Sequence, residues 1–111
     1  MEKGFKVVSN MIHYYLSASS PHPVCYQENI LTVPHKYCGP LCVFDTKKNA
    51  EVFMKSVKLY SSNYCLYECD YVSSPHQKIW CNDSVYVKLE DLPTGTKLAS
   101  KVIFRKKVSS E

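Results

Sequence analysis

The chain has 111 residues, of which 45% are hydrophobic and 22% charged, and its 14 Lys and Arg residues outnumber 10 Asp and Glu residues. A chain this short has room for one hydrophobic core, so a single domain over residues 1–111 is expected. The composition excludes collagen-like and disordered chains, and no apolar run approaches the roughly 18 residues of a membrane-spanning helix. Charges within residues 1–10 disfavour a secretory signal peptide, which predicts a cytoplasmic protein without membrane contact.

The first half of the chain predicts short strands separated by turns. Alternating β-branched and aromatic residues over 5–8 and 12–17, with Ser9-Asn10 between them, are typical of a hairpin. A proline-containing loop over 17–23 leads to a short strand at 24–26, and a further strand at 30–33 stops before Pro34. Residues 35–40 predict another loop, and the apolar run 41–44 predicts a buried strand.

One amphipathic helix is expected at about residues 46–60. Asp45 or Thr46 can cap its first turn, because their side-chain oxygens accept hydrogen bonds from unpaired helical amides. Apolar residues then recur at spacings of three and four and predict one buried face, formed by Ala50, Phe53, Met54, Val57 and Tyr60.

The second half returns to strands. In the expected strand 64–72, Cys65, Tyr67, Cys69 and Tyr71 alternate with Tyr64, Leu66, Glu68 and Asp70, and the first set is the better filling for a core. Strands at 78–81 and 84–89 are divided by Asn82-Asp83, and a basic strand at 97–108 ends the fold. These elements predict an α+β fold in which a curved, mostly antiparallel sheet of short strands packs on a single helix.

Six cysteines raise the question of disulfides, metal or plain burial. A reducing compartment favours free, buried thiols, whereas export would leave the disulfide pairing open. Cys65 and Cys69 lie roughly 13 Å apart along a strand, too far to hold one ion together. The weak zinc candidates are therefore Cys38 and Cys42 with His35. No cofactor is expected, because 3 Gly residues cannot build a phosphate-binding glycine loop.

Catalytic chemistry has few candidates. Glu68 and Asp70 share one strand face roughly 7 Å apart, a spacing suited to sharing a divalent cation or to divided acid and base roles. A solvated strand face is the preferred interpretation, because the alternate face carries the residues that can fill a core. Cys42 precedes the expected helix, yet no local signature joins it to a histidine base.

Nine tyrosines and one tryptophan are the most unusual feature of the composition. A small sheet cannot bury all of them, and exposed aromatic side chains favour a partner-binding surface. The candidate binding residues are Tyr15, Tyr37 and Trp80, together with Lys97, Lys101, Arg105 and Lys106 of the basic final strand. A protein partner is expected, with self-association or weak nucleic-acid binding through that strand as alternatives.

Several segments carry a resemblance to known domains. Gly-Phe-Lys-Val-Val over 4–8, Val-Cys-Tyr over 24–26, the stretch 39–50 and Leu-Tyr-Glu over 66–68 resemble a diffuse group of small domains from bacteriophages and large DNA viruses. The resemblance implies a virus-encoded accessory protein in the host cytoplasm and brings no catalytic residue. More remotely, residues 41–71 are similar to the strand, helix and strand of small ADP-ribosyltransferases. That likeness implies an enzyme in which His13 and Glu68 are the nominal candidates for the nicotinamide-binding histidine and the catalytic acid.

The leading hypothesis is a non-enzymatic interaction module that binds a host or viral protein through a tyrosine-rich surface. An ADP-ribosyltransferase-like enzyme is the first alternative, and a nucleic-acid binder is the second.

Overall fold

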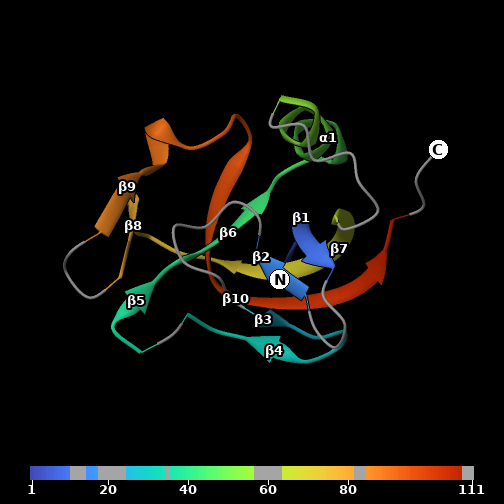
Figure 1. The fold of residues 1–111 in the computed structure, drawn as a ribbon. Helices are drawn as coiled ribbons and strands as arrows, with labels where there is room; N and C mark the ends of the chain where they lie inside the picture. The colour runs from blue at the N-terminus through green and yellow to red at the C-terminus, as the bar shows by residue number, and fades with distance from the viewer. Residues whose placement is uncertain (11–14, 18–24, 35, 57–63, 82–84, 109–111) are drawn as a thin grey trace.

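A computed structural model describes residues 1–10, 15–17, 25–34, 36–56, 64–81 and 85–108 (Figure 1). Its strands are β1 (Glu2–Asn10), β2 (Tyr15–Ser17), β3 (Cys25–Tyr26), β4 (Leu31–Thr32), β5 (Cys38–Gly39), β6 (Leu41–Phe44), β7 (Tyr64–Ser73), β8 (Lys78–Cys81), β9 (Val85–Lys88) and β10 (Thr96–Lys107). The helices are α1 (Lys47–Ser56) and the short 3₁₀ turn η1 (Leu89–Asp91). The predicted α+β class is confirmed, since the paired strands are antiparallel and one α-helix covers them.

Four long or central strands close into a small barrel. β1 pairs with β7, β7 with β10 and β10 with β6, and β6 returns to β1 through the pair Phe5 and Phe44. β10 makes this closure because it is strongly curved, as Figure 1 shows. Its first residues pair with β6 and its later ones with β7, with register shifts between Ala99 and Lys101 and between Phe104 and Lys106. Such irregularities bend a strand and increase its twist.

Alternation along β7 places one set of side chains inside the barrel. Cys65, Tyr67, Cys69 and Tyr71 are buried, as the sequence pattern predicted. Tyr26 and Tyr67 stack on the ring of Phe104 at centroid distances of 4.6 Å and 4.8 Å. These two tyrosines therefore form core. Among the tyrosines whose side chains are described, Tyr37 is the exposed one, and a tyrosine-rich surface stays a prediction.

α1 packs against the opposite, outer side of the barrel, where it contacts β1 and β6. Thr46 caps the helix by accepting a hydrogen bond from the Asn49 amide at 3.1 Å, as predicted. Ala50, Phe53 and Met54 pack with Val7 and Leu66. α1 spans 47–56, and the remainder of the predicted helix, including Val57 and Tyr60, lies outside the described residues.

A second sheet of three strands, β5, β8 and β9, lies beside the barrel. Ile79 of β8 joins it to the barrel by packing against Cys42 and Leu98. Residues 38–39 were expected in a loop, but they pair with β8. Two residues carry little strand signal by themselves, so this pairing depends on the neighbouring hairpin. None of the described helices is long and apolar enough to cross a membrane.

Candidate functional site

The outer face of the barrel carries a second group of side chains that the strand register brings into line. The register aligns Leu31, Ile103, Asp70 and Lys3 in one row across β4, β10, β7 and β1. Val72 and Lys101 are aligned in the next row. Because alternate residues of a strand share a face, these side chains all lie on the side opposite the barrel core. We call this surface, defined by Lys3, Leu31, Asp70, Val72, Lys101 and Ile103, the barrel face.

Ion pairs order the charged part of the barrel face. Arg105 donates from Nε to the Asp70 carboxylate at 2.7 Å, and Lys3 lies 3.2 Å from its other oxygen. The hydrogen bond from Arg105, with help from Lys3, lowers the pKa of Asp70. Lys106 pairs with Glu68 at 3.4 Å. These groups line a groove of about 310 Å³. Its chemistry is that of a mixed-charge contact surface with a cationic excess.

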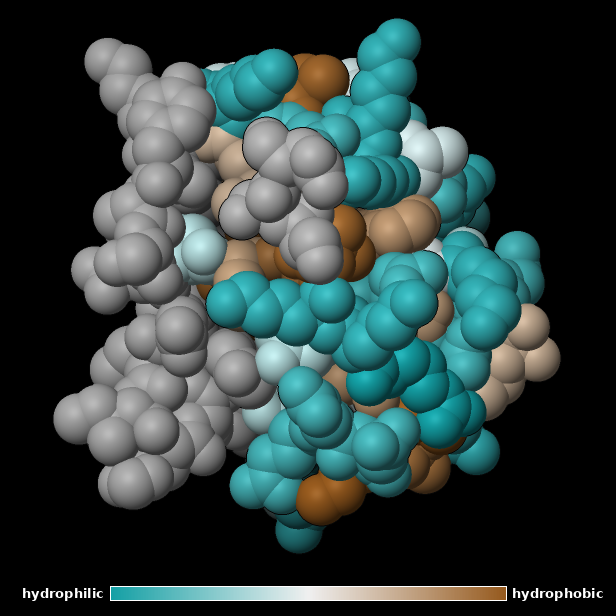
Figure 2. All heavy atoms as spheres, turned by 90° about the vertical axis from the view of Figure 1, so that its right-hand side faces the viewer, coloured by the Kyte–Doolittle hydropathy of each residue, from teal (hydrophilic) through white to brown (hydrophobic). Residues whose placement is uncertain are grey.

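Aliphatic side chains are exposed on and beside the barrel face. Leu31 is 49% exposed, Val33 51% and Val72 39%. Sequence reasoning did not identify them as contact residues, because their exposure depends on strand pairing. Figure 2 shows that the side bearing α1 and the end of β10 is mostly hydrophilic, with hydrophobic residues visible only in small separate areas.

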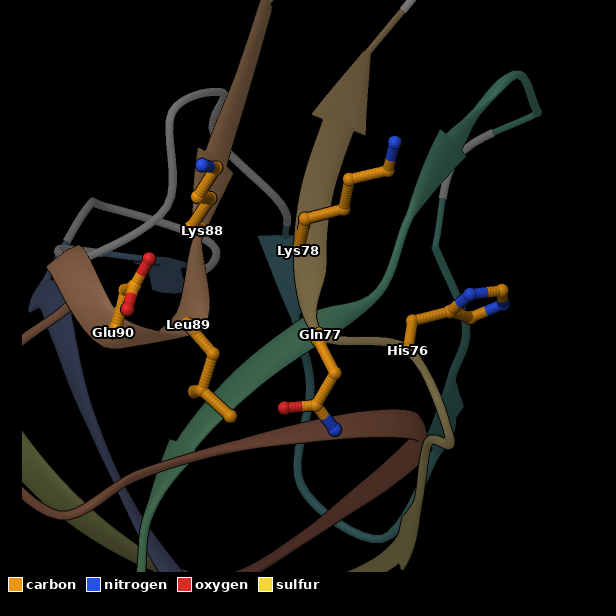
Figure 3. Close-up of a pocket in the computed structure, with 6 residues that line it drawn as sticks. All are labelled: His76, Gln77, Lys78, Lys88, Leu89 and Glu90. Atoms are coloured by element: carbon orange, nitrogen blue, oxygen red, sulfur yellow. The ribbon is translucent and has the colours of Figure 1, made fainter.

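The outward side of β8 and β9 is a second exposed face. Lys78 and Lys88 are directly opposite each other in the register, and Trp80 lies two residues along β8 on the same side. With His76, Gln77, Leu89 and Glu90, the two lysines line a hollow of about 450 Å³ (Figure 3). We call the surface defined by His76, Lys78, Trp80 and Lys88 the hairpin face.

The candidate binding residues from the sequence are distributed over these surfaces. Lys101 lies on the barrel face, and Arg105 and Lys106 line its groove, whereas Lys97 is paired with Val43 at the far end of β10. Trp80 lies on the hairpin face, and Tyr37 is 68% exposed in the turn before β5. Tyr15 belongs to β2, and its side chain lies outside the description.

The nominal catalytic residues are not seen together. Glu68 is half-buried in the groove and paired with Lys106, and His13 lies outside the described residues. The most perturbed amine is Lys6, which is fully buried in the barrel, where burial lowers its pKa. With no exposure, Lys6 is placed for a structural role and not for contact with a substrate.

The cysteines correct two expectations. Cys38 is disulfide-bonded, so the prediction that the thiols stay reduced is wrong at this position, and Cys38 has no thiolate to offer zinc. Cys42 is buried and lies outside any disulfide, and His35, the third proposed ligand, lies outside the described residues. In the part of the chain that the structure describes, no three metal-ligating side chains come together.

Comparison with known proteins gives no relative from which to transfer a function. No protein-family model matches the chain, and no curated protein or solved structure matches it significantly.

Proposed function

We propose that this chain is a non-enzymatic interaction module whose barrel face binds an extended, acidic segment of a partner protein. The observation that carries the proposal is that exposed aliphatic and basic side chains lie in neighbouring rows of one face of the sheet. Leu31 and Val72 offer apolar contacts, while Lys101 and Arg105 project among them. A partner segment that presents acidic and aliphatic side chains together on one face, at every second residue of an extended chain, would match both features.

Charge supports an acidic partner. Lys3, Lys101, Arg105 and Lys106 give four cations on or beside this face, against the two carboxylates of Glu68 and Asp70. Because both carboxylates are already paired with basic groups, the net excess of two is available to a ligand. This excess steers an acidic chain toward the face and raises its association rate at low salt.

The same face suits a protein better than a nucleic acid. Leu31 and Val72 have no favourable contact to make with phosphate groups, and the two carboxylates repel them. A second copy of this chain is a weaker match, since both partners would bring the same cationic excess. The resemblance to virus-encoded domains makes host and viral proteins the partner classes to test first.

The disulfide at Cys38 indicates the kind of compartment in which a partner would bind. Persistent disulfides are typical of oxidising compartments, so Cys38 argues against the cytoplasm that the sequence favoured. Cys42, Cys65 and Cys69 are buried thiols, which their surroundings shield from oxidants. Binding should therefore be measured on chain with the Cys38 disulfide intact.

The proposal can be tested by fluorescence anisotropy at low salt with a synthetic peptide of repeated Glu-Ser-Leu-Ser, which places glutamate and leucine on the same face of an extended chain. A peptide of repeated Lys-Ser-Leu-Ser serves as the charge control. We expect the acidic peptide to bind and the basic one not to bind. Leu31→Asp and Lys101→Glu should each weaken binding about tenfold, the effect of losing roughly 1.4 kcal/mol of contact energy.

Val52→Asp is the matched control for the apolar contact, because Val52 is 52% exposed but lies on α1. Lys47→Glu, also on α1, is the matched control for charge. Equal weakening by the control variants, binding of both peptides alike, or binding of neither would contradict the proposal. Sedimentation of the free chain as a dimer that Leu31→Asp disrupts would assign the face to self-association instead.

A further inference from the structure

β4 is an edge strand that presents apolar side chains to solvent. It pairs with β10 on one side, and no second strand of the described part of the chain pairs with it (Figure 1). Ile30, Leu31 and Val33 are all exposed. Folded proteins usually protect such edges with charged side chains, especially lysine. Residues 30–33 carry no charge, so their side chains do not oppose pairing with another extended chain.

The hydrogen bonds beside β4 show which of its backbone groups face away from β10. Asn29 donates its amide to the carbonyl of Phe104 at 2.8 Å, so the carbonyl of Phe104 points to the side of β10 on which β4 lies. Alternate residues of a strand direct their backbone groups to the same side, so those of Val102 point toward β4 as well. Thr32, opposite Val102, is therefore in a hydrogen-bonded pair. The neighbours of Thr32 turn their amides and carbonyls to the outer edge.

Leu31 and Val33 are these neighbours, and each offers one amide donor and one carbonyl acceptor to a further strand. The turn at Asn29, with φ 60, lies at one end of this edge, and Pro34, which has no amide, lies at the other. Proteins that bind peptides by strand addition use such edges, with main-chain hydrogen bonds supplying affinity and alternate side chains supplying specificity. A short extended segment is enough to fill this edge.

The barrel face beside this edge selects the side chains of an added strand. Leu31 and Val33 are two residues apart, so their side chains lie on the same face. One residue beyond the last pair of β4 and β10, Val33 comes beside Lys101, which is exposed. An added strand lies about 4.8 Å beyond β4, where its aliphatic side chains meet those of β4. Its acidic side chains extend across β4 toward Lys101.

From these observations we infer that the acidic partner segment binds β4 as an added antiparallel strand. The inference rests on the proposed function, because the same segment occupies both the edge and the face. The strand pairs of this sheet are antiparallel, and antiparallel ladders are the more stable per residue. In a hydrogen-bonded antiparallel pair, the residue opposite Leu31 or Val33 exchanges both bonds with it and shares its face. The acidic and aliphatic residues of the partner therefore make these bonds, which excludes proline from their positions.

The inference is tested with two N-methylated forms of the Glu-Ser-Leu-Ser repeat peptide, compared with the unmethylated peptide by fluorescence anisotropy at low salt. One form is methylated at the amides of glutamate and leucine, which donate to β4. The matched control is methylated at the amides of serine and carries the same side chains and the same number of methyl groups. Methylation at glutamate and leucine should weaken binding about tenfold, because it removes donors, whereas methylation at serine should leave affinity unchanged.

Amide hydrogen exchange of the chain provides a second measurement. Nuclear magnetic resonance should show exchange at Leu31 and Val33 slowing about tenfold when the unmethylated peptide saturates the chain, because these amides gain hydrogen-bond acceptors. Lys47, an exposed residue in the first turn of α1, is the control and should exchange at an unchanged rate.

Equal binding of all three peptides, or unchanged exchange at Leu31 and Val33, would overturn the inference and leave the proposed function standing. Weakening by serine methylation alone would overturn the antiparallel pairing. Absence of binding by the unmethylated peptide would refute the proposed function and the inference with it. A free chain that sediments as a dimer, with exchange at Leu31 and Val33 already slow, would assign the edge to a second copy and overturn the inference as well.

Discussion

The ammonium nitrogen of Lys6 donates a hydrogen bond of 2.6 Å to the main-chain carbonyl of Cys42 inside the barrel. Lys6 is fully buried, and its Nζ lies 5.7 Å from the centroid of the Tyr26 ring. Burying an ammonium group costs several kcal/mol, whereas losing one carbonyl partner costs about 1–3 kcal/mol. The lysine therefore destabilises the barrel relative to an apolar residue of the same length.

Lys6→Met should for this reason fold and be about 1–3 kcal/mol more stable than the parent at pH 7, as measured by urea unfolding. Burial lowers the pKa of Lys6 below 10.5, so the unfolded chain binds more protons than the folded chain between the two values. The free energy of unfolding of the parent should therefore rise with pH across that interval, and Lys6→Met should lack this rise. Lys47→Met, an exposed change on α1, should leave stability unchanged. A less stable Lys6→Met would show that the amine is a net stabilising group.

Tyr26→Phe should also stabilise the protein. Tyr26 is fully buried, and among the described residues its hydroxyl has no hydrogen-bond partner. An unsatisfied buried hydroxyl costs about 1–3 kcal/mol, while Phe keeps the stacking on Phe104. We expect a gain of about 1 kcal/mol in urea unfolding. Tyr67→Phe is the contrasting variant, since the Tyr67 hydroxyl donates to Glu28 at 2.8 Å and its loss should not stabilise. A loss of stability in Tyr26→Phe would mean that the hydroxyl is satisfied in solution.

Alkaline pH should destabilise the barrel through Cys69. Burial raises the pKa of this thiol from 9.0 to about 12. Between these values the unfolded chain has lost a proton that the folded chain keeps, so stability falls as the pH rises. Urea unfolding of Cys69→Ala should show a shallower decline from pH 9 to 12. Val102→Ala, which also opens a cavity in the core, should lower stability equally at all these pH values. Parallel pH profiles for Cys69→Ala and the parent would contradict the assignment.

Acid should act through Asp70. The pKa of Asp70 is lowered from 3.8, chiefly by the hydrogen bond from Arg105. The contribution of Asp70 to stability is therefore complete above pH 3.8, and it is lost as the pH falls through the pKa of the folded state. Asp70→Asn should cost about 0.5–1 kcal/mol at pH 7, because Arg105 is partly exposed and the pair is screened. The variant should also lose less stability on acidification than the parent. Glu68→Gln should lower stability at pH 7 by less than Asp70→Asn does, because the ion pair of Glu68 with Lys106 is longer and more exposed.

Residue patterns in single elements predicted much of this fold. Alternation in β7 identified the inward set led by Cys65 and Tyr67, and the cap at Thr46 located the start of α1. Both follow from side-chain periodicity within one segment, which needs no knowledge of neighbouring strands. The final basic strand was expected at 97–108 and is observed at 96–107, again because the pattern lies within one segment.

Features that depend on pairing between segments were not predicted. Lys6 lies between apolar residues of β1, where a lysine is expected to point to solvent. The burial of its side chain inside the barrel follows only from the pairing of β1 with its neighbouring strands. Leu31 belongs to a two-residue strand whose exposure follows from its position beside β10. The pairing of Lys78 with Lys88 was easier to predict from the sequence. The two strands were expected to be divided at Asn82-Asp83, and an antiparallel pairing about that point brings the two lysines opposite each other.

The disulfide at Cys38 allows a prediction about how the small sheet is held. The β5–β8 register places Cys81 directly opposite Cys38, at a separation that suits a disulfide between neighbouring antiparallel strands. Digestion without reduction should therefore release one linked pair of peptides that contain Cys38 and Cys81. Because β5 has two residues, Cys38→Ser should lower stability by about 2–4 kcal/mol, as measured by urea unfolding. Binding of the acidic peptide at the barrel face should be unchanged, because the strands of that face belong to the other sheet. Recovery of Cys38 with another cysteine, or unchanged stability of Cys38→Ser, would contradict this role of the disulfide.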